Sequence, residues 1–279
     1  MIEKVDVVIW AKNGAKTLSA VLKQAEKVIP ARYVRNYILS DDYSSDNTRE
    51  IAESFGWQVV MNKGRGISDN ANTALNHVES DYFISLEQDV LLAKDWWQKI
   101  PPLLFSDSKV AVASGVRVPS QPLALRKLQE YTIERYQRRD TGREFFHDCK
   151  SLDNTIYKTA IIRELGGFPP DCNLPKRIFQ SGYKWKVDYS VKSIHIRNGM
   201  KDELDHYYWY GTLAREYRSG MKDAILRMFF SPIRGLHAAV KKKNPEIVFL
   251  YPLIRLYIVR GMLEGKESNN AYPLAHLSK

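Results

Sequence analysis

The sequence has few of the features that define several large classes of protein. Only two cysteines, Cys149 and Cys172, occur among 279 residues. Two distant thiols cannot form a disulfide framework, and they lack the paired spacing of a zinc site. No internal repeat, low-complexity tract or Gly/Ser-rich linker divides the chain. We therefore expect a cytoplasmic protein built on one substantial core, with room for a small extension.

Long apolar runs are also missing. The apolar stretch near the N-terminus carries Asp6, and it lacks the charge layout and cleavage site of a signal peptide. Pro252, Arg255 and Arg260 interrupt the most apolar segment, residues 247–262. It therefore falls short of the roughly 18 uninterrupted apolar residues of a spanning helix. We expect no helix that crosses a membrane.

Acidic residues are too few to balance the basic ones. Lys and Arg number 42 against 32 Asp and Glu, which gives a formal net charge of +10. Such a surplus attracts nucleic acid, anionic lipid or phosphorylated substrates. Residues 215–266 contain eleven Lys and Arg against four Asp and Glu, so most of the excess is C-terminal. Because no nucleic-acid-binding motif accompanies these residues, we expect no nucleic-acid partner.

Two interpretations of the basic C-terminal region stay open. Its helices could pack in the ordinary way, with charged side chains extending to the surface, or they could lie in the headgroup zone of an anionic membrane. The second interpretation predicts peripheral contact with the cytoplasmic face of the membrane. Its apolar face would consist of residues 228–230, 250–251 and 254–259, and its cations would be Arg234, Lys241, Lys242, Lys243, Arg255 and Arg260.

Apolar periodicity in the first 120 residues alternates between strand and helix. Strands are expected at 5–10, 33–40, 58–61, 82–86 and 110–118, and helices around 18–25, 46–55, 69–78 and 94–104. This alternation predicts an α/β fold with a mostly parallel, Rossmann-like sheet flanked by helices. Beyond about residue 202 the strands stop. We therefore predict an α/β domain at 1–200 and a helical C-terminal region at 201–279.

Polar side chains follow each of the first four predicted strands. Asn13 follows the first, Asp41 and Asp42 the second, residues 63–66 the third and residues 87–89 the fourth. Parallel α/β sheets bind ligands at the carboxyl ends of their strands, where loops gather and helix N-termini attract anions. The sequence thus predicts one binding site at this edge of the sheet.

Two acidic clusters indicate what this site binds. Asp41 and Asp42 suit a turn before a helix, but two adjacent carboxylates repel each other unless a ligand or neighbour satisfies them. Glu87 and Asp89 project to the same side of an extended stretch, an arrangement that suits a divalent cation also held by a diphosphate. When residues 87–89 are considered alone, a solvated strand end is the better explanation, because acidic pairs close many strands.

The order and spacing of these elements resemble glycosyltransferase family 2, which has a GT-A fold. The segments that carry the resemblance are WAKNG (10–14), LSDDYSSDNT (39–48), NKGRGISDNAN (62–72), EQD (87–89), GGFPPDCNLPKRIFQSGYKW (166–185) and SIH (193–195). The resemblance implies an inverting transferase that uses a UDP- or GDP-sugar with Mn²⁺ or Mg²⁺. Its acceptor would be a glycan or a lipid-linked molecule.

The resemblance also implies roles for individual residues. It assigns donor contacts to Ala11, Asn13, Asp41, Asp42, Lys63, Gly66, Glu87 and Gln88, the metal to Asp89 and His195, and the general base to Asp171. A helix N-cap is the alternative for Asp171, and a structural histidine is the alternative for His195.

Several positions depart from the family pattern. Glu87 replaces the first aspartate of the D-x-D motif, Gly14 stands where an acidic residue is usual, and Ala71 stands where an arginine is common. Pro170 replaces the glutamate of an E-D pair whose aspartate is Asp171. These departures motivate a second hypothesis, a degenerate member that binds nucleotide-sugar or glycan without turnover. A sugar-phosphate nucleotidyltransferase is disfavoured, because AKNGAKT (11–17) lacks its Gly-rich basic loop.

Overall fold

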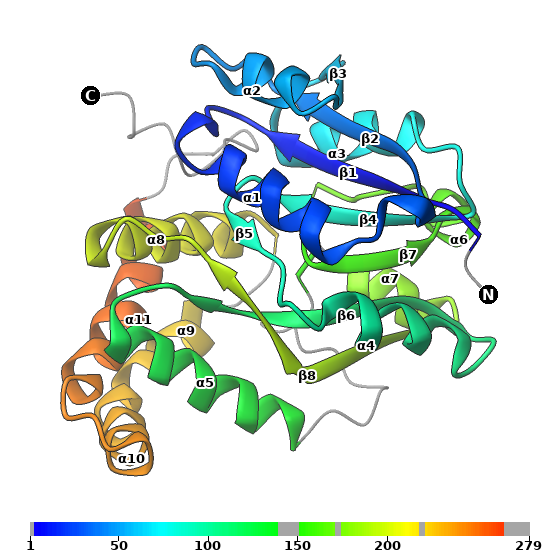
Figure 1. Ribbon diagram of the computed structural model, residues 1–279. Coiled ribbons are helices and arrows are strands. Elements are labelled where there is room, and N and C mark those ends of the chain that lie inside the picture. The colour runs from blue at the N-terminus through cyan, green and yellow to red at the C-terminus, as the bar shows by residue number, and fades with distance from the viewer. Residues whose placement is uncertain (1–2, 139–150, 171–173, 218–220, 265–279) are drawn as a thin grey trace. The chain divides into compact units, whose positions relative to one another are not determined.

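A computed structural model describes residues 3–138, 151–170, 174–217 and 221–264 (Figure 1). The chain divides into two compact units. Met1–Arg117 and Tyr136–His195 form the first, here named the sheet unit, and Val118–Arg135 and Ile196–Lys279 form the second, named the helical unit. Asp171, the predicted general base, lies outside the described residues.

Within the described residues, eight strands form one sheet in the order β3-β2-β1-β4-β7-β6-β8-β5. The first four strands are β1 (Val5–Ala11), β2 (Val34–Asp41), β3 (Gln58–Met61) and β4 (Tyr82–Glu87). β1 pairs in parallel with β2 and β4, and β2 pairs in parallel with β3. This part of the sheet confirms the predicted strands and brings their carboxyl ends together.

Other strand pairs of the sheet are antiparallel. β7 (Thr155–Lys158) pairs with β4 and with β6 (Val110–Pro119). β5 (Val90–Leu91) pairs with β8 (Lys184–His195). The sheet is therefore mixed, with parallel pairs among the first four strands and antiparallel pairs that involve β7 and β5. Periodicity did not indicate β5 or β7, because segments of two and four residues are too short to show an apolar pattern.

The central strand β1 is buried on both faces, as is typical of a parallel strand covered by helices. Its alternate side chains enter two different cores. Val7 and Ile9 pack in the cluster that contains Leu18 of helix α1 (Ala15–Val28). Val8 and Trp10 pack in the cluster that contains Ala71 of helix α3 (Gly66–Asn76). The two helices therefore cover opposite faces of the sheet (Figure 1).

The remaining helices of the sheet unit are short. They are α2 (Thr48–Ser54), α4 (Trp96–Lys99), the 3₁₀ helix η2 (Pro101–Phe105), α6 (Thr159–Glu164) and α7 (Leu174–Gln180). The single helix predicted at 94–104 is wrong, since α4 ends at Lys99 and a 3₁₀ helix follows. Pro101 and Pro102 cause the break, because a proline ring inside an α-helix removes a hydrogen bond and clashes with the preceding turn.

The helical unit contains most of α5 and four C-terminal helices. These are α5 (Leu123–Gln137), α8 (Met200–Tyr217), α9 (Met221–Phe229), α10 (Ser231–Lys242) and α11 (Ile247–Glu264). A β-carbon on Gly211 would lie 2.1 Å from the carbonyl oxygen of Ile258, and one on Gly261 would lie 2.0 Å from that of Tyr208. Two glycines thus let α8 and α11 pack with their backbones in contact.

The core of the helical unit contradicts part of the predicted membrane-facing surface. Leu250, Tyr251 and Ile254 are at most 6% exposed and pack with Leu128 of α5 and Ala238 of α10. These side chains form an interior, and they are unavailable to lipid. Among the helices that the structure describes, none combines the length and the apolar character needed to cross a membrane.

Candidate donor and metal site

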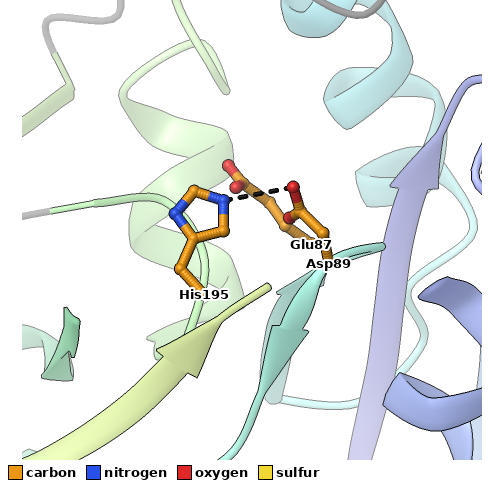
Figure 2. A group of neighbouring side chains, drawn as sticks. All are labelled: Glu87, Asp89 and His195. Carbon is orange, nitrogen blue, oxygen red and sulfur yellow. Dashed lines mark hydrogen bonds and ion pairs between the residues drawn. The ribbon is translucent and has the colours of Figure 1, made fainter. Parts of the chain in front are cut away.

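Three side chains with metal-ligating atoms converge at the end of the sheet. Glu87 ends β4, Asp89 lies between β4 and β5, and His195 ends β8. The antiparallel register places Val90 opposite His195. His195 Nε2 therefore lies 3.1 Å from Asp89 Oδ2, although 106 residues separate them in the sequence. Figure 2 shows the imidazole and the two carboxylates pointing toward one another, and their ligand atoms all lie within 4.8 Å of each other.

Glu87 also forms an ion pair with an arginine. Arg117 Nη1, on β6, lies 3.0 Å from Glu87 Oε2 and 3.2 Å from Asp153 Oδ1. Asp153 is completely buried, so the guanidinium compensates a carboxylate that water does not reach. Sequence reasoning missed Arg117 and Asp153. A charged residue inside the otherwise apolar strand VAVASGVRVP (110–119) was the available signal for Arg117.

Asp42 is held by two donors at the end of β2. Asn62 Nδ2 donates to its Oδ1 at 2.7 Å, and Lys12 Nζ lies 3.1 Å from its Oδ2. The side chain of Asp42 is only 3% exposed. The repulsion between adjacent carboxylates noted in the sequence is thus offset for Asp42 by an amide and an ammonium group.

Asp41 closes a turn. The Ser44 backbone N–H donates to its Oδ2 at 2.8 Å, and the Ser44 hydroxyl donates to its Oδ1 at 2.5 Å. Asp41 is fully buried, and Arg49 Nε lies 3.9 Å from Oδ2. These contacts are those of a side chain that stabilises its own loop, so its donor contact stays a prediction.

The loop after β1 packs against the loop after β2. Asn13 has a left-handed backbone with φ of 52°, and its Oδ1 accepts from the Ser45 N–H at 2.9 Å. The carbonyl oxygen of Ala11 accepts from the Asp42 N–H at 2.9 Å and from Asn70 Nδ2 at 3.2 Å. Asn13, Ala11 and Asp42 therefore belong to one continuous surface of loops.

Lys63 and Gly66 lie in the loop that leads into α3. The Lys63 N–H donates to Thr73 Oγ1 at 3.2 Å, and Gly66, at φ of 81°, is the first residue of the helix. The helix starts here because glycine adopts positive φ without the penalty that a β-carbon imposes. The structure thus places both residues beside a helix N-terminus, where backbone N–H groups favour an anion.

Gln88 connects the metal-ligating segment to the loop after β1. Its Oε1 accepts from the Lys12 N–H at 2.8 Å, and its Nε2 donates to the Lys12 carbonyl oxygen at 3.1 Å. The amide thus satisfies both backbone groups of one residue. This contact gives Gln88 a structural role, and its predicted contact with the donor stays a prediction.

The turn that precedes Asp171 is attached to α3. Asn72 Oδ1 accepts from the Phe168 N–H at 2.8 Å, and Asn72 Nδ2 donates to the Phe168 carbonyl oxygen at 2.9 Å. The Ser68 hydroxyl donates to the same carbonyl at 2.6 Å. Helix α3 therefore carries the loop of Lys63 at its N-terminus and holds the Gly167–Phe168 turn on its side.

The fold is an α/β domain that gathers a candidate metal-ligating group, Glu87, Asp89 and His195, at the strand ends of its sheet. The sequence pattern of Glycosyl transferase family 2 matches residues 6–166, more than half of the chain. The chain belongs to this family, and its sheet unit has the GT-A fold that the sequence motifs predicted. No curated protein sequence matches the chain.

Solved structures resemble the chain in fold at low sequence identity. Mannosyltransferase PcManGT from Pyrobaculum calidifontis, in complex with GDP-Man and Mn²⁺, is 16% identical with a TM-score of 0.58, covering 94% of this chain and 76% of that one. Glucosyl-3-phosphoglycerate synthase from Mycobacterium tuberculosis, in complex with Mn²⁺, UDP and phosphoglyceric acid, is 14% identical with a TM-score of 0.52, covering 72% and 73%. At these identities the comparison establishes the fold.

Proposed function

We propose that this protein is an inverting, metal-dependent glycosyltransferase that moves a sugar from a UDP- or GDP-sugar to a glycan or lipid-linked acceptor. The convergence of Glu87, Asp89 and His195 carries the proposal, because it brings three potential metal ligands together at the strand ends of a family 2 domain. The solved relatives support it, since one holds GDP-Man with Mn²⁺ and another holds UDP with Mn²⁺.

The ligand set fits a divalent cation. Two carboxylates and one imidazole, all within 4.8 Å, provide oxygen and nitrogen atoms. Mg²⁺ prefers oxygen ligands, whereas Mn²⁺ also accepts imidazole, so the histidine favours Mn²⁺ over Mg²⁺. Asp89 and His195 would hold the ion, and Glu87 would provide the second carboxylate of the ligand set. A bound cation supplies positive charge to the departing diphosphate.

The other predicted residues are assigned by position. Asp42, Asn13 and Ala11 lie at the ends of β1 and β2, where a carboxylate or carbonyl can accept hydrogen bonds from a base or a ribose. Lys63 and Gly66 lie at the N-terminus of α3, which suits a phosphate. Asp171, after the turn held by Asn72, would take the proton of the acceptor hydroxyl as the sugar is transferred.

Thermal shift with nucleotide and metal tests the donor site. UDP or GDP with Mn²⁺ should raise the unfolding midpoint, since ligand at a hundredfold excess over its Kd stabilises the native state by about 2.7 kcal/mol. EDTA should remove the metal-dependent part of the shift, and Asp89→Asn should remove it equally. Asp81→Asn is the matched control, because Asp81 directly precedes the first residue of β4, at the other end of the strand from Glu87 and Asp89. If neither EDTA nor Asp89→Asn reduces the nucleotide-induced rise in the unfolding midpoint, the result contradicts the proposal.

A degenerate, non-catalytic member is the second candidate. Arg117 engages the carboxylate of Glu87 at 3.0 Å, and Pro170 stands in place of an acidic residue next to Asp171. An assay of nucleotide-sugar hydrolysis with Mn²⁺ separates the two candidates. A catalyst should turn over and lose about 10²–10⁴-fold in rate in Asp171→Asn while it keeps donor affinity. Tight donor binding without turnover across acceptors favours the degenerate candidate.

A further inference from the structure

Helices α9 and α10 carry an apolar surface that the described helical unit leaves uncovered. No residue of α9 is buried. Seven large apolar side chains on the two helices are 43–75% exposed, namely Ile225, Leu226, Phe229, Phe230, Ile233, Leu236 and Val240. Single exposed apolar residues are ordinary on a protein surface, whereas a contiguous group of this kind marks a binding surface.

These side chains, here called the stripe, lie on two successive helices that meet at Phe230. The Phe230 N–H donates to the Leu226 carbonyl at the end of α9, and the Arg234 N–H donates to the Phe230 carbonyl at the start of α10. Ile225 and Phe229 are four residues apart within α9, and Ile233, Leu236 and Val240 follow at spacings of three and four within α10. Residues at such spacings lie above one another on a single helix face.

The stripe faces away from the core of the helical unit. The opposite side of α10 consists of Gly235, Ala238 and Ala239, which are buried. A β-carbon on Gly235 would lie 3.0 Å from the Val248 carbonyl oxygen, so α10 is fixed against the N-terminal part of α11. This close packing keeps the small residues inside and the large apolar residues outside.

Cations accompany the stripe on both helices. Arg234 and Lys241 are seven residues apart, which places them on one line of α10, and Arg227 lies on α9. Arg227 pairs with Asp223 at 2.7 Å and Lys241 with Glu134 at 3.1 Å, but the partners are about half exposed and such pairs are weak. Residues 221–246 contain six Lys and Arg against two Asp and Glu, a net charge of +4.

We propose that this α9–α10 stripe is a membrane-binding surface that lies in the headgroup region of an anionic bilayer. The large apolar side chains would enter the acyl boundary, while the cations of the two helices meet lipid phosphates. Charge complementarity favours lipid over a second copy of the chain, because another copy carries the same positive surplus on this stripe. The surface shares no residue with the donor site and goes beyond the proposed function.

Vesicle sedimentation of the full chain tests the surface. The protein should bind vesicles of phosphatidylcholine with 30% phosphatidylglycerol, and should bind pure phosphatidylcholine at least about tenfold more weakly, since each nearby cation adds about 1 kcal/mol on an anionic surface. Phe229→Ser with Ile233→Ser and Val240→Ser should reduce binding to anionic vesicles by about tenfold or more. Arg227→Gln with Arg234→Gln should weaken binding and reduce its salt dependence.

Matched variants distinguish binding through this surface from non-specific hydrophobic or electrostatic binding of the chain to vesicles. Leu123→Ser removes an equally exposed apolar side chain from α5, and Lys23→Gln with Lys27→Gln removes two exposed cations from α1. Both controls should bind vesicles as the unmodified chain does. The nucleotide-dependent thermal shift should be unchanged in all variants, which shows that the donor site is intact.

Three results would overturn the membrane surface. They are the absence of vesicle binding, equal binding to neutral and anionic vesicles, and unchanged binding in the triple serine variant. If the chain instead forms dimers that the triple serine variant dissociates, and vesicles do not bind, the stripe is a contact between copies of the chain.

Discussion

At the scale of single residues, Gly14 and Gln88 explain each other. Gly14 stands where the family usually has an acidic residue, and its φ of −94° is open to any side chain. A β-carbon there would lie 2.7 Å from Gln88 Oε1 and 2.9 Å from Gln88 Cδ. The amide of Gln88 cannot give way without losing its two hydrogen bonds to Lys12. The Gln88 side chain therefore occupies the space that an acidic side chain at position 14 would need, which explains the glycine there.

We expect Gly14→Ala to destabilise the protein by about 1–3 kcal/mol, because the β-carbon displaces the Gln88 amide. A Gln88→Ala background removes the two closest contacts and leaves only the 3.2 Å approach to the β-carbon of residue 88, so the same substitution should cost less there. Urea unfolding of the four proteins of this cycle measures the coupling. Additive effects of the two substitutions contradict the explanation.

At the scale of elements, apolar periodicity predicted what lies close along the chain and missed what depends on pairing between distant segments. The parallel strands and the first helix follow from apolar periodicity, and the residues at strand ends lie where that topology places them. The approach of His195 to Asp89 depends on β5, a two-residue strand that periodicity cannot reveal, so only the family resemblance grouped these two residues. The Arg117–Asp153 contact depends equally on how β6 and the segment before β7 meet in space.

Helix α3 connects the proposed donor loop of Lys63 with the turn that precedes the proposed base, Asp171. Its N-terminus follows the loop of Lys63, and its side chains Ser68 and Asn72 hold the Phe168 backbone. A β-carbon on Gly167 would lie 2.3 Å from Asn72 Oδ1, so the glycine lets the turn approach the helix. The spacing between the donor loop and the turn before Asp171 is thus set by one rigid element.

We expect Asn72→Ala to reduce turnover more than donor affinity, because it frees the turn without touching the proposed metal ligands. Loss of two hydrogen bonds to Phe168 should also cost about 1–3 kcal/mol of stability. Asn76→Ala is the matched control, since Asn76 is exposed at the end of the same helix. Donor Kd and the rate of sugar transfer are measured for both. Equal losses of affinity and rate indicate that Asn72 supports the donor loop instead of the turn.

At the scale of the whole molecule, the helical unit is assembled from two separate stretches of sequence. Val118–Arg135 joins Ile196–Lys279, so most of α5 belongs to the C-terminal helices although it precedes β7. Leu125, Leu128 and Tyr131 of α5 pack with Ala238 and Leu250. Helical periodicity shows that a segment has an apolar face but does not show which core receives it. The predicted boundary at residue 200 therefore rests on the change of pattern alone.

Truncation after residue 199 tests that boundary. The fragment would keep α5 but lose the helices against which Leu125, Leu128 and Tyr131 pack, so three large apolar side chains would face solvent. We expect it to bind the dye ANS more strongly than the full chain and to aggregate on size-exclusion chromatography. Leu125→Ser with Leu128→Ser should lower dye binding in the fragment, whereas the same pair should destabilise the full chain by several kcal/mol, at about 2–5 for each lost core side chain. A monomeric fragment 1–199 without dye binding would instead support an independent domain that ends near residue 200.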